Sequence, residues 1–491
     1  MAATDPLCRS FLDLWWHFDP GDATAGRLGD FGPEAVRQHT AALRSIAAAV
    51  EELDVEATGD EIDRTALLDH VRVLIFRLEH EHPYRINPML WTDHLVRSFA
   101  EPPAATGEAL AAAAALERIR GVPAFCRSAQ ESLRKPPALL LAGAVDQLDT
   151  VPGRIERNRR RYATLWSAGA GDAGALVAEA RSALGELRAA LEEQLVPDLD
   201  PHAGAIGSAE ADRRLHYEHA SIHNAGEIWR TALRRAAEVE QEVTALAAAV
   251  DPGRPWREAY RAAAGEPLPP AEALSAFHEY REAADRFARA HGLLPEDWSA
   301  PLEPEPGPVD TPLAAPAGAL PWLAVRWGVP GALLLESARR GLPGLVRRHI
   351  AASSTTGGWA LYAQELMAEL GYRAEPESRL VERVLVLQDI HLALVDIGLH
   401  TRQLTTEEAL AHLSGRVPLD PTAAAGQVRR MLTFPLAACA ALLGRQELRR
   451  LREDYQAGRG EAVTLADFHR DLLEYGALPI PLIRWGLGLD A

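Results

Sequence analysis

The sequence predicts an almost entirely α-helical protein, and two observations support this prediction. Apolar residues recur at positions i, i+3, i+4 and i+7, with charged residues between them, over most of the 491-residue chain. This spacing places the apolar side chains on one face of a helix. Alanine, leucine, glutamate and arginine, which favour helices, fill the same segments. The clearest predicted helices span residues 34–53, 108–120, 175–194 and 225–250.

Prolines mark the ends of the predicted helices. A proline ring removes a backbone donor and clashes with the preceding helical turn, so each proline or proline-glycine pair predicts a helix boundary. These boundaries fall at Pro83, Pro88, Pro136-Pro137, Pro152-Gly153, Pro252-Gly253 and Pro269-Pro270. No period of 34–47 residues repeats, which argues against a helical solenoid.

One change of composition predicts the domain organisation. Eight prolines stand between residues 295 and 321, where no helix could persist. We therefore expect an N-terminal helical lobe at 1–295, a proline-rich connector at 296–321 and a C-terminal helical lobe at 322–491. A connector of this length either borders or covers a functional cleft, or is a surface link with no role of its own.

Charge and cysteine content exclude several classes of function. The net charge of -18 repels phosphate backbones and anionic lipid headgroups, which argues against nucleic acid as a partner. Cys8, Cys126 and Cys439 lie far apart without CxxC spacing, which favours a reducing compartment, so we expect a cytoplasmic protein. Nearly all positive charge is arginine, with Lys135 the single lysine, and this bias indicates a GC-rich genome such as an actinobacterial one.

Hydropathy gives no reason to expect a membrane protein. Asp5, Arg9 and Asp13 interrupt any apolar run of the kind that a signal peptide needs. The longest apolar stretch, 434–444, is about half of the roughly 20 residues that a membrane span requires. We therefore expect no membrane partner.

Two short segments resemble the metal-binding motifs of a known family. The first is Arg339-Arg340-Gly341-Leu342-Pro343-Gly344-Leu345, and the second is Gly357-Gly358-Trp359-Ala360-Leu361-Tyr362-Ala363-Gln364. Both resemble motifs of the bacterial domain-of-unknown-function 885 family, which usually read His-Glu-x-x-Pro-Gly-His and Glu-Gly-Trp-Ala-x-Tyr-x-Glu. The resemblance implies a metallopeptidase-like architecture of two helical lobes around a central cleft.

At the positions of the metal ligands the chain departs from the family pattern. Arg339, Arg340 and Leu345 stand where the resemblance places the two histidines and the catalytic glutamate, and Gly357 stands at the third-ligand glutamate. A register shifted by four residues would restore a glutamate at 336 but no histidine. Zinc hydrolysis needs about three such ligands and a nearby base. The sequence therefore predicts no metal and no other cofactor.

The resemblance extends beyond these two motifs. Similar stretches are Asn87-Pro88 with Trp91, 369–372, 394–400, 406–413 and 467–479. A tyrosine expected in the 435–444 helix, a plausible oxyanion donor, is replaced by Ala440 or Ala441.

Three residues are predicted to carry acid-base chemistry if the protein is an enzyme. Asp396 and His400 are spaced i, i+4, which on a helix brings a carboxylate within hydrogen-bonding reach of an imidazole and would raise the pKa of the histidine. Tyr362 is the predicted donor. The alternative for the pair is a buried contact that fastens two helices.

Three further residues are predicted to bind a ligand. Arg339 and Arg340, with Trp359, could clamp the carboxylate or phosphate of a small anion. The alternative is that these arginines are ordinary solvated charges, as most surface charges are.

Other histidines suggest metal sites but have simpler explanations. His216, His219 and His223 share one helical face, which could chelate an ion but is more typical of a packed or solvated face. His80 and His82 flank Glu81 beside Pro83, where a solvated helix end is the simpler explanation. His469 is expected to be a buried packing residue.

Three functions follow from these observations. The first is a pseudo-hydrolase that lost its zinc ligands and binds a small molecule, in one version an anion, or a partner in the old cleft. The second is a metal-independent biosynthetic enzyme that uses His400, Asp396 and Tyr362. The third is an active zinc hydrolase with an improvised site of His349, His391, His400 and Glu365. The sequence does not predict an oligomeric state.

Overall fold

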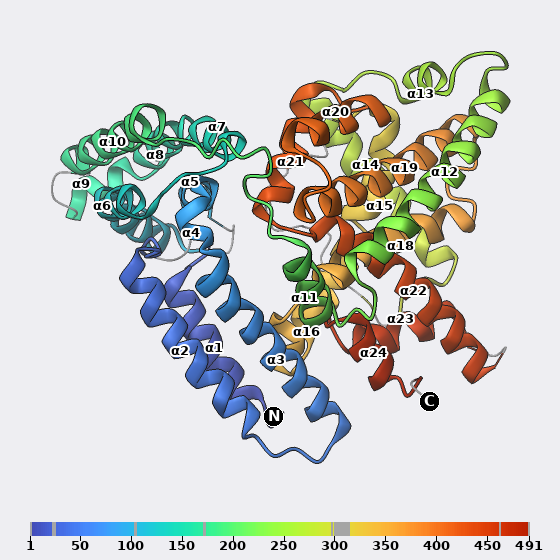
Figure 1. Ribbon diagram of the computed structural model, residues 1–491, viewed down its shortest axis with the longest axis horizontal. Helices are drawn as coiled ribbons and strands as arrows, with labels where there is room; N and C mark the ends of the chain where they lie inside the picture. Colours follow the sequence, from blue (N-terminus) through green and yellow to red (C-terminus); the bar gives the residue numbers. More distant parts are fainter. Residues whose placement is uncertain are drawn as a thin grey trace. The chain divides into compact units, whose positions relative to one another are not determined.

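The computed structural model describes residues 2–21, 26–102, 106–169, 173–295, 298, 315–460 and 463–489. Within these ranges the ordered structure is helical, and only three isolated β-bridges occur (Figure 1). The predicted all-α fold class is therefore confirmed.

Contacts along the chain divide it into two compact units. Unit 1 comprises residues 1–5, 53–70 and 205–491, and unit 2 comprises residues 6–52 and 71–204. No boundary of either unit falls within the predicted connector at 296–321, of which residues 296, 297 and 299–314 lie outside the described part of the chain. The role predicted for that connector stays a prediction.

Unit 2 contains most of the first ten helices, although residues 58–70 of α3 and Asp5 of α1 belong to unit 1. The elements are α1 (Asp5–Phe18), α2 (Pro33–Glu51), α3 (Thr58–Phe76), the π-helix η1 (Arg77–Glu81), α4 (Pro83–Ile86), α5 (Pro88–Ser98), α6 (Glu108–Ser132), α7 (Ala138–Leu148), α8 (Val151–Arg161), α9 (Ala163–Gly169), α10 (Ala173–Ala189) and the π-helix η2 (Ala190–Gln194).

An aromatic and alanine-rich core holds unit 2 together. The rings of Phe31, Trp91 and Phe125 are buried and meet edge to face at centroid distances of 5.2–5.8 Å. Buried alanines of α6, among them Ala115 and Ala129, belong to the same core, and small side chains of this kind allow neighbouring helices to approach closely.

Unit 1 holds the remaining helices and both motif segments. The elements are α11 (Ser208–His219), α12 (Ala225–Val250), α13 (Trp256–Ala264), α14 (Pro270–Ala290), the 3₁₀-helix η3 (Ala317–Ala319), α15 (Leu320–Trp327), α16 (Ala332–Gly341), α17 (Leu345–His349), α18 (Ser353–Glu369), α19 (Pro376–His400), α20 (Thr406–Arg416), α21 (Pro421–Thr433), α22 (Ala437–Arg459), α23 (Leu465–Leu473) and α24 (Ile480–Gly486).

Helices α18 and α19 form the centre of unit 1. Helix α18 packs extensively on α22, and α19 packs on both α12 and α22. Most of α19 is buried, including Leu387, Ile390 and Leu394. The second motif segment, on α18, therefore belongs to the packed interior of this unit, whereas Arg340, Gly341 and Pro343 of the first segment are exposed.

The predicted helix boundaries hold where capping signals are strong. Helix α12 has the predicted bounds, since Asn224 accepts a hydrogen bond from the Glu227 amide and the Glu227 side chain bonds back to the Asn224 amide. The sequence did not predict that α6 continues through Pro123 to Ser132. Helix α6 extends twelve residues beyond the predicted end, because packing of its buried face overrides the local cost of proline.

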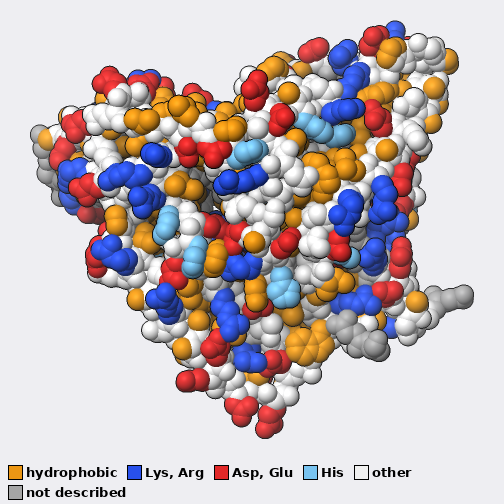
Figure 2. All heavy atoms as spheres, viewed as in Figure 1, with side chains coloured by type: hydrophobic (Ala, Val, Ile, Leu, Met, Phe, Trp, Pro, Cys, Tyr) orange, Lys and Arg blue, Asp and Glu red, His pale blue; other side chains and the backbone are white. Residues whose placement is uncertain are grey.

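One stretch, Ala317–Gly341, is long and apolar enough to cross a membrane by length and composition. In the structure this stretch is divided among η3, α15 and α16, and 67% of its apolar window is buried. Core helices of globular proteins have the same properties. On the visible face in Figure 2, basic and acidic side chains are interspersed.

Candidate functional site

The two predicted ligand-binding arginines lie on α16 and share one carboxylate. Arg339 donates through Nε and Nη2 to Oε2 of Glu336, at 3.0 and 2.6 Å, and Arg340 donates to the other oxygen at 2.8 Å. Arg339 also donates to the carbonyl of Arg348 at 2.7 Å. Burial alone would raise the pKa of Glu336, but the hydrogen bonds and charges of the arginines hold this pKa below its usual value. Both guanidinium groups therefore already have an anionic partner.

The segment between α16 and α18 is fastened to the N-terminal residues of the same unit. The amide of Leu345 donates to Oδ1 of Asp5 at 2.8 Å, and Nε of Arg347 donates to Oδ1 of Asp63 at 2.8 Å. Leu345, where the resemblance would place a histidine, is buried. This residue contributes packing and cannot coordinate a metal.

Helices α18 and α22 approach too closely to leave room for a ligand side chain at residue 357. A β-carbon on Gly357 would lie 2.6 Å from Cβ of Ala441, and one on Gly358 would lie 2.6 Å from the carbonyl carbon of Gly444. A β-carbon on Gly444 would in turn lie 1.8 Å from the carbonyl oxygen of Ser354. Distances this short do not occur in packed proteins, so the contact depends on the absence of side chains.

Tyr362 and Trp359 belong to a buried aromatic cluster with His469 of α23. The Tyr362 hydroxyl lies 3.0 Å from Nε2 of His469, and Nδ1 of His469 donates to the carbonyl of Leu293 at 2.7 Å. Since Nδ1 carries the proton, Nε2 accepts from the tyrosine hydroxyl. The indole N–H of Trp359 donates to the carbonyl of Pro330 at 2.8 Å, and none of the residue is exposed.

Burial sets the protonation states of this cluster. It lowers the pKa of His469 to about 4 and raises the pKa of Tyr362 above its usual value. Both groups are therefore neutral at physiological pH. The expectation that His469 packs in the interior agrees with its exposure of 1%.

Asp396 caps the first turn of α22. Its Oδ1 accepts the amide of Leu436 at 3.0 Å, and its Oδ2 accepts the amides of Ala438 and Cys439 at 2.9 and 3.2 Å. Complete burial raises the pKa of Asp396 to about 7, although these backbone hydrogen bonds act in the opposite direction. The carboxylate thus satisfies amides that would otherwise lack an acceptor at a helix start.

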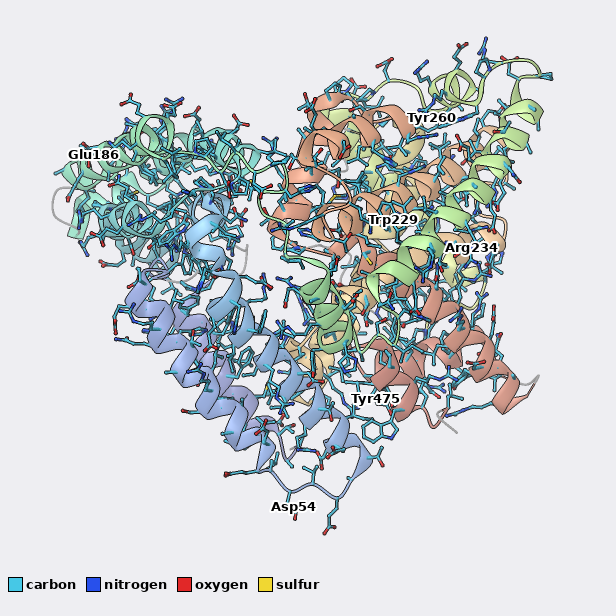
Figure 3. The ribbon with its side chains drawn as sticks, viewed as in Figure 1. Asp54, Glu186, Trp229, Arg234, Tyr260 and Tyr475 are labelled. Atoms are coloured by element: carbon cyan, nitrogen blue, oxygen red, sulfur yellow. The ribbon has the colours of Figure 1, made fainter. Side chains whose placement is uncertain are left out.

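The rest of the 394–400 segment also serves packing between helices. Nε2 of His400 donates to the carbonyl of Met431 at 3.0 Å and lies 3.6 Å from Oδ1 of Asp396, and both side chains are fully buried. A β-carbon on Gly398 would lie 2.8 Å from the ring of Trp229, labelled on α12 in Figure 3. In this Asp-x-Gly-x-His segment, Gly398 therefore packs α19 against α12, and Asp396 joins α19 to the residues that precede α22.

The structure brings some predicted residues together and separates others. Asp396 and His400 lie 3.6 Å apart, which is longer than a hydrogen bond. Arg339 and Arg340 share Glu336, and Tyr362 packs beside Trp359 at a centroid distance of 5.6 Å. The partner of Tyr362 is His469, which sequence reasoning treated only as a packing residue.

The histidines of the improvised zinc site have different partners. Nδ1 of His391 lies 2.9 Å from Nε2 of His412, and Glu365 pairs with Arg445 and Arg449. On the 216–223 stripe, His219 is buried, and His223 lies 3.5 Å from Glu227. Across the described ranges, no three or more His, Cys, Asp or Glu side chains are grouped so that they could hold a metal ion.

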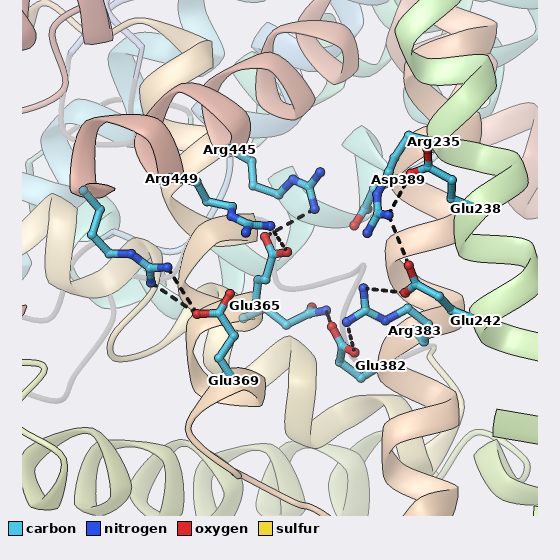
Figure 4. Close-up of polar contacts among 12 residues, drawn as sticks. Arg235, Glu238, Glu242, Glu365, Glu369, Glu382, Arg383, Asp389, Arg445 and Arg449 are labelled. Atoms are coloured by element: carbon cyan, nitrogen blue, oxygen red, sulfur yellow. Dashed lines mark hydrogen bonds and ion pairs between the residues drawn. The ribbon is translucent and has the colours of Figure 1, made fainter. Parts of the chain in front are cut away.

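Sequence reasoning missed a charged network inside unit 1, and Figure 4 shows part of it, including Glu365, Glu382 and Arg445. Arg326 of α15 donates to Gln364 and to Asp389, the latter at 3.1 Å, and Gln364 donates to Oε1 of Glu382 at 3.1 Å. Glu382 has no exposed surface. Gln364, the position of the family's second-motif glutamate, is therefore one link in a chain of buried polar contacts.

The same network joins α18 to α22. Glu365 accepts from Arg445 at 3.3 Å and from Arg449 at 2.9 Å, and Glu369 accepts from Arg452 at 3.3 Å. The signal was present in the sequence, since acids spaced i, i+4 on α18 face arginines spaced i, i+4 and i+7 on α22. Recognising it required knowing that these two helices are neighbours.

A sequence model of the family described as bacterial protein of unknown function (DUF885) matches residues 16–319 and 312–486. The chain belongs to the DUF885 family. No curated protein of known function matches the sequence.

Two solved structures share the fold of this DUF885 protein over nearly its full length. One is a candidate lipoprotein of unknown function from Shewanella oneidensis, with 18% identity, a TM-score of 0.76 and 98% of each chain covered. The other is a candidate lipoprotein from Colwellia psychrerythraea, with 17% identity, a TM-score of 0.80, and 100% of this chain and 99% of that chain covered. Identity at this level relates the proteins by fold alone.

Proposed function

We propose that this DUF885 protein is a pseudo-hydrolase, which keeps a metallopeptidase-like scaffold and acts by binding a small molecule instead of by metal-dependent hydrolysis. The observation that carries the proposal is the contact at Gly357. A side chain at this position would collide with Ala441, so α22 occupies the space that a third metal ligand would need.

The donor set supports the same proposal. A catalytic zinc needs about three nitrogen, sulfur or carboxylate ligands that converge on one point. Arg339, Arg340, Leu345 and Gly357 offer none, and Glu336, the nearest carboxylate on α16, is held by two arginines. These residues do not fit a zinc ion.

The competing enzyme hypotheses gain less support. The acid-base hypothesis needs Asp396 and His400 at a surface that a substrate can reach, whereas both are fully buried and hydrogen-bonded to backbone groups. Binding of an anion by Arg339 and Arg340 would require these arginines to release Glu336. A ligand at the motif segments would therefore have to compete with Glu336 for both arginines.

Metal content and hydrolysis measured on one preparation test the proposal. We expect far less than one zinc per chain by elemental analysis, and no chelator-sensitive cleavage of peptide or ester substrates. A DUF885 protein that carries the intact His-Glu-x-x-Pro-Gly-His motif is the positive control. Stoichiometric zinc together with activity that is lost in chelator and restored by zinc would overturn the proposal.

Two observations point to different locations for the protein. The cysteines Cys8, Cys126 and Cys439 are buried and outside disulfides, as expected in the cytoplasm. Both structural neighbours are candidate lipoproteins, which favours an envelope location for this chain as well. We propose cell fractionation of the native host as the deciding measurement.

A further inference from the structure

A cavity of about 810 Å³ lies within unit 2, whereas both motif segments belong to unit 1. It is lined by residues of α2, η1, α4 and the C-terminal part of α6, together with Phe31 and Arg134. Its volume falls in the range of pockets that hold small organic molecules, roughly 300–1,000 Å³. The lining combines an apolar floor with charged groups at the rim.

Aromatic and aliphatic side chains form the floor. The rings of Phe31 and Tyr84 stack at a centroid distance of 4.4 Å with 17° between their planes. Val36 of α2 and Leu78 of η1 complete the apolar part of the lining. A floor of this composition favours a ligand with an aromatic or apolar body.

Two exposed arginines of the lining, Arg85 and Arg134, are joined through their backbones. The amide of Arg134 donates to the carbonyl of Arg85 at 2.8 Å, which joins α4 to the residues that follow α6. Nη1 of Arg134 donates to the carbonyl of Leu133 at 2.7 Å. Among the described residues, no carboxylate lies within ion-pair distance of either guanidinium.

The other charges of the lining largely offset one another. Arg44 pairs with Glu79 at 2.5 Å, and Arg37 pairs with Glu34 outside the cavity. Glu131 is the second carboxylate of the lining. Four arginines and two glutamates thus line a cavity in a protein whose net charge is -18, so the cavity is locally basic against the overall charge.

The backbone that shapes this rim is irregular. The π-helical turn η1 ends at His82, which adopts the left-handed conformation with φ of 47°, and Nδ1 of His82 lies 3.1 Å from the carbonyl of Leu78. Pro83 follows and starts α4, which carries Tyr84 and Arg85. π-turns and left-handed non-glycine residues are concentrated at functional sites. His80 and His82 are exposed at this helix end, as the sequence predicts, and the same segment also lines the cavity.

We propose that this cavity binds an organic anion with an aromatic or apolar body, with Arg85 and Arg134 holding the anionic group and the Phe31–Tyr84 stack contacting the body. The inference rests on the proposed binding function and supplies its site and ligand class. Guanidinium groups hold carboxylates, sulfonates and phosphates through paired N–H donors, and these charge-assisted contacts are stronger than neutral ones.

Two fluorescent dyes that differ in charge test the ligand class. Anilinonaphthalene sulfonate carries a sulfonate on an aromatic body, and N-phenylnaphthylamine has nearly the same body without the charge. We expect the sulfonate dye to bind the full-length protein with one site per chain and at least tenfold more tightly than the neutral dye. Equal affinity of the two dyes would overturn the assignment of an anionic ligand.

Three variants test the location. Arg85→Gln and Arg134→Gln should each raise the Kd of the sulfonate dye about tenfold or more, and Val36→Trp should weaken binding by placing a larger ring in the apolar part of the lining. Arg120→Gln is the matched control, because Arg120 is an exposed arginine of α6 that pairs with Glu117 and does not line the cavity. The Kd of the sulfonate dye for this variant should equal that for the wild-type protein. Far-UV circular dichroism and the unfolding midpoint establish that each variant is folded.

Dye binding that is unchanged in both Arg85→Gln and Val36→Trp would overturn the proposed site. That failure is distinguishable from failure of the pseudo-hydrolase proposal, which zinc content and chelator-sensitive hydrolysis decide independently of any dye.

Discussion

Gly357 of α18 lies against Ala441 of α22 so closely that a β-carbon on the glycine would be 2.6 Å from the alanine Cβ. In the family motif that this segment resembles, a glutamate stands at the position of Gly357. The close approach of α18 and α22 at this point depends on glycine at residue 357, since a larger side chain there would clash with Ala441.

Gly357→Ala should destabilise the protein. Replacing a glycine in a helix interior by alanine normally raises the free energy of unfolding by about 0.5–1 kcal/mol. Here the added β-carbon must push α22 away, and overpacking of this kind costs about 1–3 kcal/mol. Urea unfolding followed by circular dichroism measures the difference.

Two further variants make this prediction specific. Gly426→Ala in α21 is the control, because nothing beyond its own helix backbone lies within 4 Å of the place that a β-carbon would take, and it should be neutral or slightly stabilising. Adding Ala441→Gly to Gly357→Ala should recover much of the lost stability, since the two residues are in direct contact. If Gly357→Ala behaves like the control, the close contact between α18 and α22 is not present in solution.

Stability should depend on pH through Asp396. Because burial raises the pKa of this carboxyl to about 7, the folded protein binds a proton that the unfolded chain has released, and stability falls as the pH rises. The stabilising effect of the bound proton is fully present below about pH 4 and is lost as the pH rises through about 7, on the order of 4 kcal/mol in total.

Asp396→Asn isolates this effect, since asparagine keeps the shape of the neutral carboxyl and cannot ionise. Between about pH 5 and 8 the stability of wild type, measured relative to that of the variant, should decline with increasing pH. Urea unfolding of both proteins at matched pH values gives this difference. A difference that is constant or grows with pH would show that Asp396 is ionised throughout as a helix cap.

The Glu365 carboxylate should be far more important for stability than its neighbour Glu369. Glu365→Gln leaves Arg445, whose exposure is 5%, without its anionic partner, and breaking a buried pair in this way costs about 3–5 kcal/mol. Glu369→Gln is the matched control one helical turn away. Its side chain is 39% exposed, and pairs of this kind contribute roughly 0–1 kcal/mol.

Differential unfolding of the two variants at low and high salt checks this prediction. The loss for Glu365→Gln should persist at high salt, because buried charges are screened much less than exposed ones. Similar small losses for both variants would mean that water reaches the α18–α22 network.

The helical architecture could be predicted because its determinants are local. The 3.6-residue spacing of apolar side chains and the capping residues Asn224 and Glu227 lie within a few turns of α12, and its predicted bounds were confirmed. The π-helical turn η1 and the passage of α6 through Pro123 were not predicted, since both depend on packing against other helices.

The candidate sites divide in the same way. From the sequence alone, the family resemblance and the absence of histidine and carboxylate at 339, 340, 345 and 357 could be established, because identity at a position needs no coordinates. Only the tertiary structure decided which neighbours these positions contact and where a cavity lies. Asp396 accepts a hydrogen bond from Leu436, which lies 40 residues later in the sequence. Gly357 contacts Ala441, and Arg85 accepts a hydrogen bond from the amide of Arg134, which follows α6. Contacts between residues so far apart follow from how whole helices pack, which no local pattern of residues records.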